Sequence, residues 1–417
     1  MLRRAFVLLV GTVVLNGCTT VNGPRGYAGP PMPLGVGQSA PGAPSGAGGS
    51  RVAILLPLSG ARADIGQSML HAAQLALDAP GAPPLDAKDT AGTPEGAAAA
   101  AREAIAGGAG LLLGPLTSAE TAAVAPIARP AGVAVLAFTN DPSQAQPGVW
   151  TLGITPGQQV RRLVAASQAQ GKSQFAALLP DTDFGHVMAD ALNQATAANN
   201  ASADVRFYQR GMAGINASAR DLSGYASRRG PIDAQIRAAR AEGTPEGRRR
   251  AQELAKSGIP PASFNALLLA DTGEALSEIA AVLPYYDVDR SAVQILGPAL
   301  WASSSSGSGQ MPGAWYAAPD PAARGSFDQG YSAKYGGSPP PIADLAFDAA
   351  SIARVLGGHG GYSVGALTQA GGFSGVDGWL ALLPDGQVRR ALAVFAIERG
   401  GPQMVEPAPQ SGNVPGA

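Results

Sequence analysis

The chain has 417 residues, of which 46% are hydrophobic, and its formal net charge is −1. This length allows two or three domains with a large apolar core, and the balanced charge gives no reason to expect a nucleic-acid partner. The single cysteine excludes an intrachain disulfide framework and a cysteine-rich metal site.

The N-terminus has the organisation of a secretory signal. Arg3 and Arg4 precede an apolar run over residues 5–15, which is shorter than the roughly 20 residues that a membrane-spanning helix needs. The run ends in Leu-Asn-Gly-Cys18, which resembles the lipobox of bacterial lipoproteins. The resemblance implies that residues 1–17 are a signal peptide and that acylated Cys18 anchors the protein to a lipid membrane. The alternative is an ordinary signal peptide with a chance cysteine.

The residues after the cysteine indicate a destination and a tether. Lipoproteins that stay in the inner membrane generally have Asp directly after the cysteine, and this chain has Thr19 there. We therefore expect a periplasmic protein that is anchored in the inner leaflet of the outer membrane. Residues 18–50 are mostly Gly, Pro, Ala and Ser, and this composition predicts a flexible lipidated tether. The same composition predicts a disordered tail over residues 401–417.

Between these segments, buried strands alternate with amphipathic helices. Continuous apolar runs predict strands at 51–58, 108–114, 132–138, 174–179, 203–208, 264–270 and 292–296. Periodic apolar positions predict helices at 66–77, 95–106, 118–128, 185–198, 272–283, 320–335 and 343–356. Residues 379–400 predict a hairpin across Asp385-Gly386. This alternation predicts an α/β fold of two lobes, each a doubly wound, mostly parallel sheet with flanking helices.

A charged segment interrupts the alternation. Residues 210–256 carry ten Arg or Lys against five Asp or Glu, although the whole chain is slightly acidic. The pattern predicts two short helices around a Gly-Thr-Pro turn, within a charged helical insertion at about 210–260. This insertion is either a solvated surface element or a basic surface for an acidic partner or for the anionic glycan wall.

The sequence lacks the motifs of several enzyme classes. "QGKS" at 170–173 has Ala166 where a P-loop needs its first Gly, and it lies after a predicted helix instead of after a strand. The three His residues, at 71, 186 and 359, have no metal-ligand spacing, and the S-x-x-K motif does not occur. We therefore expect a non-enzymatic protein without a cofactor or a metal site.

Short polar side chains follow several of the predicted strands. In open α/β sheets, ligands bind beyond the carboxyl ends of the strands, where helix N-termini offer free N–H groups. Hydroxyls and amides at these turns could hold a carboxylate, and an acidic side chain there could pair with an amino group. The same residue types are preferred N-caps and turn residues, so each could instead have a purely local role. The candidate cleft residues are Ser59, Thr117, Ser118, Thr139, Asn140 and Asp271.

The N-terminal half of the folded region resembles a known fold. "VAILLPLSGARADIGQSMLHAAQLAL" and "GLLLGPLTSAETAAVAPIARPAGVAVLAFTND" are similar to the opening of the type I periplasmic-binding fold, which branched-chain amino-acid receptors for ABC transporters share. The resemblance runs from about 51 to 400. It implies lobe 1 at about 51–157 and 298–370, and lobe 2 at about 158–297 and 371–400.

Further segments resemble one branch of this fold. The charged insertion before "FNALLLADTGEAL", then "LPYYDVD" and "FDQGYSAKYGGSPPPIADLAFDAA", are similar to the LppC or LpoA-type penicillin-binding-protein activator lipoproteins. The resemblance implies an outer-membrane lipoprotein that binds and stimulates a bifunctional peptidoglycan synthase. The best-known members carry a helical repeat domain before the binding-protein fold, and this chain has the tether at that place.

Two main functions therefore remain open, with a structural scaffold as a further alternative. The first is regulation of peptidoglycan synthesis through contact with a penicillin-binding protein, with candidate contact residues Arg228, Arg229, Arg248, Arg249, Arg250, Tyr285 and Tyr286. The second is a solute receptor for an amino acid or a similar small ligand. In receptors of this fold, hydroxyls on the turns that match Thr117, Ser118 and Thr139 bind the carboxylate, and the nearest equivalent of the acidic partner for the amino group is Asp271. The second function lacks a site if these residues do not converge on one cleft.

Overall fold

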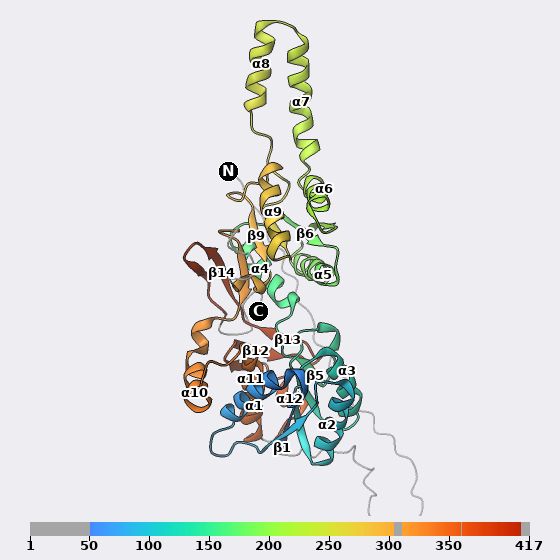
Figure 1. Ribbon diagram of the computed structural model, residues 1–417, viewed down its shortest axis with the longest axis vertical. Helices are drawn as coiled ribbons and strands as arrows, with labels where there is room; N and C mark the ends of the chain where they lie inside the picture. Colours follow the sequence, from blue (N-terminus) through green and yellow to red (C-terminus); the bar gives the residue numbers. More distant parts are fainter. Residues whose placement is uncertain (1–50, 304–310, 360, 410–417) are drawn as a thin grey trace, which may run out of the picture. The chain divides into compact units, whose positions relative to one another are not determined.

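The computed structural model describes residues 51–303, 311–359 and 361–409, and the lipobox and the tether lie outside them. Within these residues the strands form one sheet of five, one of seven and one of three (Figure 1). The first two sheets carry helices on both faces, which confirms the predicted α/β fold of two lobes. No helix in this described part is long and apolar enough to cross a membrane.

The five-stranded sheet of lobe 1 is parallel and buried on both faces. Its order is β2 (Leu85–Asp89), β1 (Arg51–Leu56), β3 (Ala109–Leu113), β4 (Ala134–Ala137) and β5 (Val149–Thr151). One face packs against α1 (Ala63–Ala76), α10 (Gly325–Tyr335), α11 (Ala343–Gly357) and α12 (Val364–Leu367). The other packs against α2 (Pro94–Ala106) and α3 (Ser118–Ala128). Because both faces are covered, β1 and β3 are continuous apolar runs in the sequence.

The seven-stranded sheet of lobe 2 has the order β15-β14-β10-β9-β8-β6-β7, with β14 and β15 antiparallel to their neighbours. Its strands are β6 (Phe175–Pro180), β7 (Ala203–Tyr208), β8 (Ala266–Leu269), β9 (Gln294–Gly297), β10 (Trp315–Ala318), β14 (Ala393–Glu398) and β15 (Gly401–Glu406). One face packs against α4 (Pro156–Ala169) and α5 (Asp183–Ala197). The other packs against α6 (Met212–Leu222) and α9 (Gly273–Tyr285).

The lobe boundaries differ from the expected ones. The segment 298–370 was expected in lobe 1, but β10 lies in lobe 2 because it pairs in parallel with β9. The segment 371–400 was expected in lobe 2, but β11 (Phe373–Gly375), β12 (Gly378–Leu382) and β13 (Val388–Arg390) form the three-stranded sheet, whose apolar side chains join the core of lobe 1. The hairpin across Asp385-Gly386 is confirmed, since β12 and β13 pair antiparallel around it.

The expectation of a disordered tail from residue 401 is wrong for residues 401–406, which form β15. β15 pairs antiparallel with β14, and Glu406 forms an ion pair with the buried Arg162 at 3.0 Å. Pro402 is compatible with this pairing because β15 is an edge strand, where one side of the backbone needs no partner.

Two of the segments that connect the lobes, the one after β13 and the one after β5, accept hydrogen bonds from buried arginines. Arg162 of α4 donates to the carbonyl oxygen of Leu392 at 2.7 Å, just after β13. Arg390, which is fully buried, donates to the carbonyl oxygen of Leu152 at 3.0 Å, just after β5. These bonds hold the connection after β13 against the connection after β5, and they fix where the two lobes meet.

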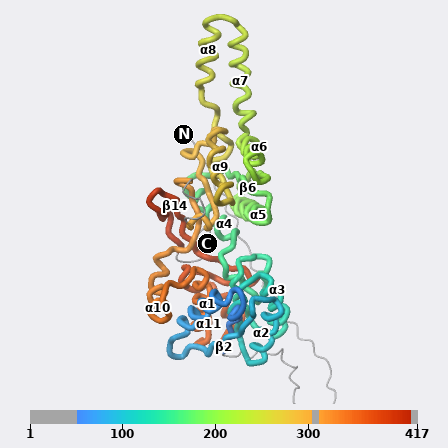
Figure 2. Tube along the Cα trace, viewed as in Figure 1, coloured from blue at the N-terminus to red at the C-terminus, as the bar shows by residue number. Residues whose placement is uncertain are grey.

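The charged segment forms the α7–α8 hairpin, α7 (Tyr225–Ala241) and α8 (Pro245–Lys256), which extends away from the seven-stranded sheet (Figures 1 and 2). Ile236, Ala239 and Ala251 form a small core between its helices. Gly247 allows the helices to approach, because a Cβ there would overlap the carbonyl oxygen of Ala239. The hairpin is shorter than the expected insertion at 210–260, since α6 instead covers the sheet.

Arg228 fastens this hairpin to lobe 2. Its guanidinium donates to the carbonyl oxygens of Ser223, Pro260 and Tyr286 at 2.8, 2.8 and 2.7 Å. These carbonyls lie before α7, after α8 and after α9, so one side chain joins three segments. Arg228 was expected on the partner surface, and the structure corrects this, because donors that are used within the fold are not available to a partner.

We expect Arg228→Ala to lower the free energy of unfolding by about 2 kcal/mol, because it removes three hydrogen bonds from a charged donor and leaves their carbonyls without it. Limited trypsin digestion should then cleave the α7–α8 hairpin faster. The matched control is Arg237→Ala, since Arg237 is exposed and forms no side-chain bond within the described residues. Equal effects of the two substitutions on thermal unfolding and on cleavage would contradict the assignment.

Candidate functional site

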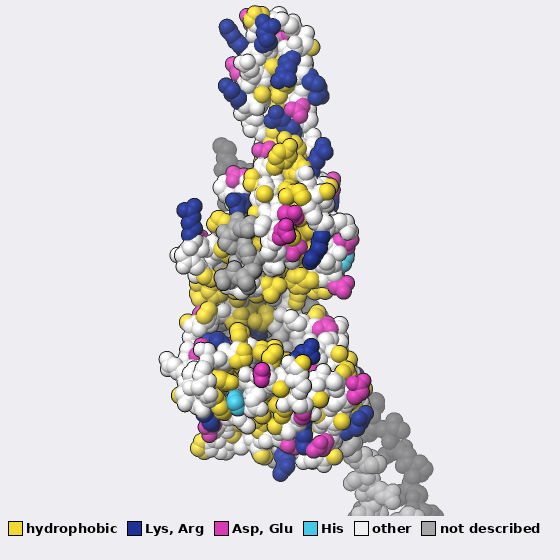
Figure 3. Space-filling model, in the orientation of Figure 1, with side chains coloured by type: hydrophobic (Ala, Val, Ile, Leu, Met, Phe, Trp, Pro, Cys, Tyr) yellow, Lys and Arg dark blue, Asp and Glu magenta, His cyan; other side chains and the backbone are white. Residues whose placement is uncertain are grey.

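A cleft of about 970 Å³ lies between the lobes, where the loops after β3, β4 and β9 meet. Its walls are largely apolar, and two of their side chains remain open to solvent: Phe184 is 37% exposed and Leu300 is 59% exposed. Figure 3 shows hydrophobic side chains gathered in this hollow. The described lining contains no Lys, Arg or His, and its acidic residues are Asp141, Asp344 and Asp377.

Thr117 and Ser118 line the cleft, but the fold uses both of their hydroxyl groups. Thr117 is the N-cap of α3, and its hydroxyl donates to Glu120 Oε2 at 2.8 Å. Ser118 donates to Asp141 Oδ2 at 2.5 Å, and Asp141 Oδ1 accepts the backbone N–H of Ser143 at 2.9 Å. The N-terminus of α3 therefore already has an anion beside it, which is the side-chain carboxylate of Asp141.

Thr139 and Asn140 also line the cleft, whereas Ser59 does not. The Thr139 hydroxyl accepts the backbone N–H of Asp141 at 3.1 Å. The exposed Asn140 side chain forms no hydrogen bond within the described part of the chain. Ser59 lies at the end of β1, where its backbone N–H donates to Asp89 Oδ1 at 3.2 Å.

Asp271 corrects the expectation of an acidic partner in the cleft. Its side chain is almost fully buried and lies outside the lining. Tyr208 donates its hydroxyl to Asp271 Oδ2 at 2.7 Å, and the backbone N–H of Thr272 donates to Oδ1 at 2.9 Å. Because Asp271 is buried away from the cleft and both of its oxygens accept internal donors, it closes the turn between β8 and α9 instead of facing a ligand. The four residues named for an amino-acid site therefore do not converge on one cleft.

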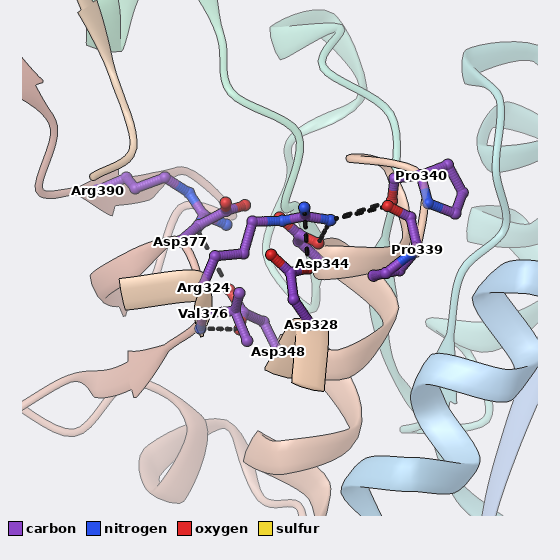
Figure 4. Close-up of polar contacts among 9 residues, drawn as sticks. All are labelled: Arg324, Asp328, Pro339, Pro340, Asp344, Asp348, Val376, Asp377 and Arg390. Atoms are coloured by element: carbon purple, nitrogen blue, oxygen red, sulfur yellow. Dashed lines mark hydrogen bonds and ion pairs between the residues drawn. The ribbon is translucent and has the colours of Figure 1, made fainter. Parts of the chain in front are cut away.

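A network of charged side chains lies under the cleft (Figure 4). Arg324 holds Asp344 with two bonds, from Nε to Oδ2 at 2.6 Å and from Nη2 to Oδ1 at 2.7 Å. Its Nη1 also forms an ion pair with Asp328 at 3.0 Å. Asp344 thus shares one guanidinium with a second carboxylate.

Arg390 has the same arrangement on the other side of the network. Its Nη1 lies 3.4 Å from Asp348 Oδ2 and 3.5 Å from Asp377 Oδ2. Asp348 Oδ1 accepts the backbone N–H of Val376 at 2.6 Å. In each half of the network two carboxylates share one arginine, which leaves one negative charge without a cation when all groups are ionised. Within the described residues, no such cluster is arranged to hold a metal ion.

The protonation of this network follows from its burial. Burial raises the pKa of Asp344 to about 6, and the hydrogen bond from Arg324 opposes this rise. Burial raises the pKa of Asp348 to about 7, with Arg390 opposing the rise and the neighbouring Asp377 adding to it. At Asp141, burial raises the pKa, but the hydrogen bonds from Ser118 and Ser143 outweigh it and keep the value below its ordinary range. The carboxylate of Asp141 is therefore ionised at neutral pH.

Sequence reasoning missed the carboxylates of the cleft, although two signals were present. Asp344 and Asp348 are four residues apart on the apolar face of α11, a spacing that places both on one buried side of a helix. Buried aspartates must be paired or hydrogen-bonded, so this spacing indicates that partner groups fold back onto the helix. Asp141 precedes Pro142, which is a turn signal and does not by itself indicate a cleft.

The second candidate surface is the α7–α8 hairpin with the neighbouring α9. Several of the predicted contact residues are engaged within the fold: Arg229 with Asp233 at 2.9 Å, Arg250 with Glu242 at 2.8 Å, and Arg248 with the carbonyl of Gly243 at 3.3 Å. Of the basic side chains of the hairpin, the exposed Arg237, Arg240, Arg249 and Lys256 form no bond within the described residues. Figure 3 shows Lys and Arg side chains over this hairpin.

The two tyrosines next to the hairpin differ in exposure. Tyr285 is 73% exposed, whereas Tyr286 is 5% exposed and donates its hydroxyl to Asn216. Tyr286 was expected on the partner surface, and the structure corrects this, since its ring packs under Tyr225 and Tyr285. The available basic and aromatic surface therefore consists of Tyr285 and the unbonded Arg237, Arg240, Arg249 and Lys256 of the hairpin.

Comparison with known proteins shows the fold family. The family model described as periplasmic binding protein matches residues 50–402. A structure from Rhodospirillum rubrum assigned to a branched-chain amino acid ABC transporter is 20% identical over 85% of this chain and 99% of its own, with a TM-score of 0.64. The C-domain of LpoA from Haemophilus influenzae, a regulator of PBP1A, is 17% identical over 85% of this chain and 99% of its own, with a TM-score of 0.60. The match spans 59% of full-length LpoA. No curated protein matches the sequence.

The network under the cleft predicts a dependence of stability on pH. Folded Asp348 keeps its proton up to about pH 7, whereas an unfolded aspartate releases it near pH 4. The folded state therefore binds more protons between these values, and the free energy of unfolding decreases as the pH rises from about 4 to about 7. We expect the melting temperature of the native protein to fall by a few degrees, relative to Asp348→Asn, between about pH 5 and pH 7.5.

Thermal unfolding at the two pH values measures this difference. Asp190→Asn, on the exposed side of α5 in lobe 2, is the control and should follow the native protein. The interpretation fails if native and Asp348→Asn proteins change in parallel with pH.

Proposed function

The chain belongs to the periplasmic binding protein family, and we propose that it is a non-catalytic, lipid-anchored protein that regulates peptidoglycan synthesis by binding a penicillin-binding protein. The family is consistent with a periplasmic location. Acylation of Cys18 would hold the folded lobes to the membrane through the 18–50 segment, in the inner leaflet of the outer membrane. The solved structure described as a regulator of PBP1A has the same fold and supports this choice of partner.

The observation that carries the proposal is the α7–α8 hairpin. Residues 225–256 carry eight Arg or Lys against four Asp or Glu, a net charge of +4 on an element that contributes little to the core of lobe 2. The hairpin has exposed guanidinium groups that form no ion pair or hydrogen bond within the described chain, and these include Arg237, Arg240 and Arg249. An element of this kind suits contact with an acidic protein surface, where charge complementarity sets the rate and the specificity of association.

The cleft supports the proposal because the polar groups expected to bind an amino acid are already hydrogen-bonded within the fold. The hydroxyls of Thr117 and Ser118 donate to Glu120 and Asp141, so neither donates to a ligand carboxylate. Asp271 is bonded to Tyr208 and Thr272. A receptor for a free amino acid needs these groups to be available. Without them, the charged groups of the buried ligand would have no hydrogen-bond partners, which costs binding free energy.

A solute receptor for an ABC transporter is the second candidate, and one observation favours it. Thr117, Ser118, Thr139 and Asn140 line one cleft of about 970 Å³, a volume within the usual range of about 300–1,000 Å³ for small-molecule sites. The structure from Rhodospirillum rubrum, which is assigned to such a transporter, has the same fold. In this candidate function, the partner is a membrane permease and the cleft is the working site.

Affinity capture distinguishes the two functions. The tagged, lipidated protein is recovered from mildly solubilised envelopes, and bound penicillin-binding proteins are labelled with a fluorescent β-lactam and identified by mass spectrometry. We expect a bifunctional synthase to be enriched, and its recovery to fall at least fivefold when Arg237, Arg240 and Arg249 are replaced by Gln.

The matched control changes the same net charge elsewhere. Arg102, Arg354 and Arg399 are exposed and form no side-chain bond within the described residues, so their replacement by Gln should leave recovery unchanged. Equal loss in both triple variants would indicate a general charge effect and would overturn the role of the hairpin. Enrichment of permease subunits without a synthase would favour the second candidate.

The membrane anchor has its own test. We expect Cys18→Ser to abolish labelling by a radioactive fatty acid, because the thiol that accepts the lipid is absent, and to move the protein from the membrane fraction to the soluble fraction. Gly17→Ala, which keeps a small residue before the cysteine, is the control and should remain in the membrane fraction. Labelling of the Cys18→Ser protein would contradict lipidation at this position.

A further inference from the structure

We propose that the cleft binds a small organic amine with an apolar body, and that Asp141 is the carboxylate that pairs with its ammonium group. This inference goes beyond the regulatory role of the hairpin. It depends on the chemistry of the cleft lining, which differs from that of a site for a free amino acid.

The apolar body of the ligand is indicated by the walls. Leu116 and Phe138 line the lobe 1 side, and Ile154, Phe184 and Leu300 line the lobe 2 side. Phe184 and Leu300 remain partly exposed, so a ligand that covers them removes apolar surface from water. The volume of about 970 Å³ is in the range of pockets for small molecules, so we assign the occupant to a free small molecule and not to a segment of a partner protein.

The cationic head is indicated by the charge of the lining. The carboxylates of Asp344 and Asp377 have Arg324 and Arg390 as partners, whereas Asp141 has no cation partner within the described residues. Its bonds come from a hydroxyl and a backbone N–H, which stabilise the anion without neutralising it. The lining offers no described Lys, Arg or His, so a ligand cation faces no competing positive side chain.

A carboxylate on the ligand would be repelled in this cleft and would lack a hydroxyl donor. The N-terminus of α3 carries about half a positive charge, which would attract an anion, but the full negative charge of Asp141 already lies against it. The Ser118 hydroxyl has a single hydrogen, and this hydrogen is donated to Asp141. An amino acid would therefore place its carboxylate next to a like charge and without the hydroxyl donor. Removing that carboxylate from the ligand should improve binding.

Four compounds that share a phenyl-alkyl body test whether the cleft prefers a cation to a neutral, zwitterionic or anionic ligand. Phenethylamine is the cation, 2-phenylethanol the neutral analogue, phenylalanine the zwitterion and 3-phenylpropanoate the anion. We expect isothermal titration calorimetry of the full folded chain at neutral pH to give at least tenfold tighter binding of phenethylamine than of the alcohol or of phenylalanine, and no measurable binding of 3-phenylpropanoate. Absence of phenethylamine binding at millimolar concentration, or equal binding of phenylalanine and phenethylamine, overturns the proposal.

Variants of Asp141 make the assignment specific. Asp141→Asn keeps acceptors for Ser118 and Ser143 but removes the charge, and it should weaken phenethylamine binding at least tenfold with little effect on 2-phenylethanol. Asp141→Ala also releases the Ser118 hydroxyl and should increase the affinity for phenylalanine relative to phenethylamine. Unchanged binding of phenethylamine by both variants excludes Asp141 as its partner.

Asp289 provides a closely matched control. Its Oδ1 accepts the backbone N–H of Ser291 at 2.8 Å and its Oδ2 accepts the Ser291 hydroxyl at 2.7 Å, so it also accepts one backbone N–H and one serine hydroxyl, outside the cleft. Asp289→Asn should therefore keep the amine preference. If Asp289→Asn and Asp141→Asn weaken binding equally, the effect is one of net charge and the proposed site is wrong. Capture of a synthase tests the hairpin separately, so each inference can fail alone.

Discussion

One buried guanidinium joins the elements on which the cleft depends. Arg390 is fully inaccessible to solvent, and it donates to the Leu152 carbonyl while it pairs with Asp348 and Asp377. A buried charge without partners costs several kcal/mol, so the sheet that contains Arg390, the helix that contains Asp348 and the connection after β5 must stay together. Asp377 also lines the cleft. The connection after β5 and the floor of the cleft therefore share one electrostatic constraint.

The same principle of pairing decides what the cleft offers. A hydroxyl donates one hydrogen, and a buried carboxylate whose two oxygens both accept internal donors presents no oxygen to a ligand. The hydrogen of the Ser118 hydroxyl is donated to Asp141, and the buried Asp271 accepts from Tyr208 and Thr272. Positions that look like ligand contacts in the sequence are thus structural bonds in the fold. The turns that resemble those of amino-acid receptors show that the backbone follows the same course. Binding depends instead on which donors and acceptors have no partner within the fold.

The sequence predicts most of the architecture because its signals are local. Apolar runs and helical periods place β1, β3, α3 and α11 within a few residues of their observed bounds. The lobe boundaries were missed because β10 and the three-stranded sheet are assigned by pairing and packing with residues distant in sequence. β15 was missed because Pro and Gly lower strand propensity, while an edge position tolerates them. In the site, Thr117 to Asn140 could be placed from strand ends, but Arg228 and Tyr286 depend on tertiary contacts that no local pattern records.

The two candidate surfaces are connected through a single helix of lobe 2. The carbonyl of Asp271, just before α9, accepts the indole N–H of Trp301 at 2.9 Å, beside Leu300 of the cleft. The carbonyl of Tyr286, just after α9, accepts Arg228 at the base of the hairpin. α9 is about 20 Å long and buries its apolar side against the sheet, so it has one position relative to lobe 2. Coupling between the surfaces requires an element with two positions. Because α9 is packed in one position, it holds the lobe 2 side of the cleft and the base of the hairpin in one fixed arrangement.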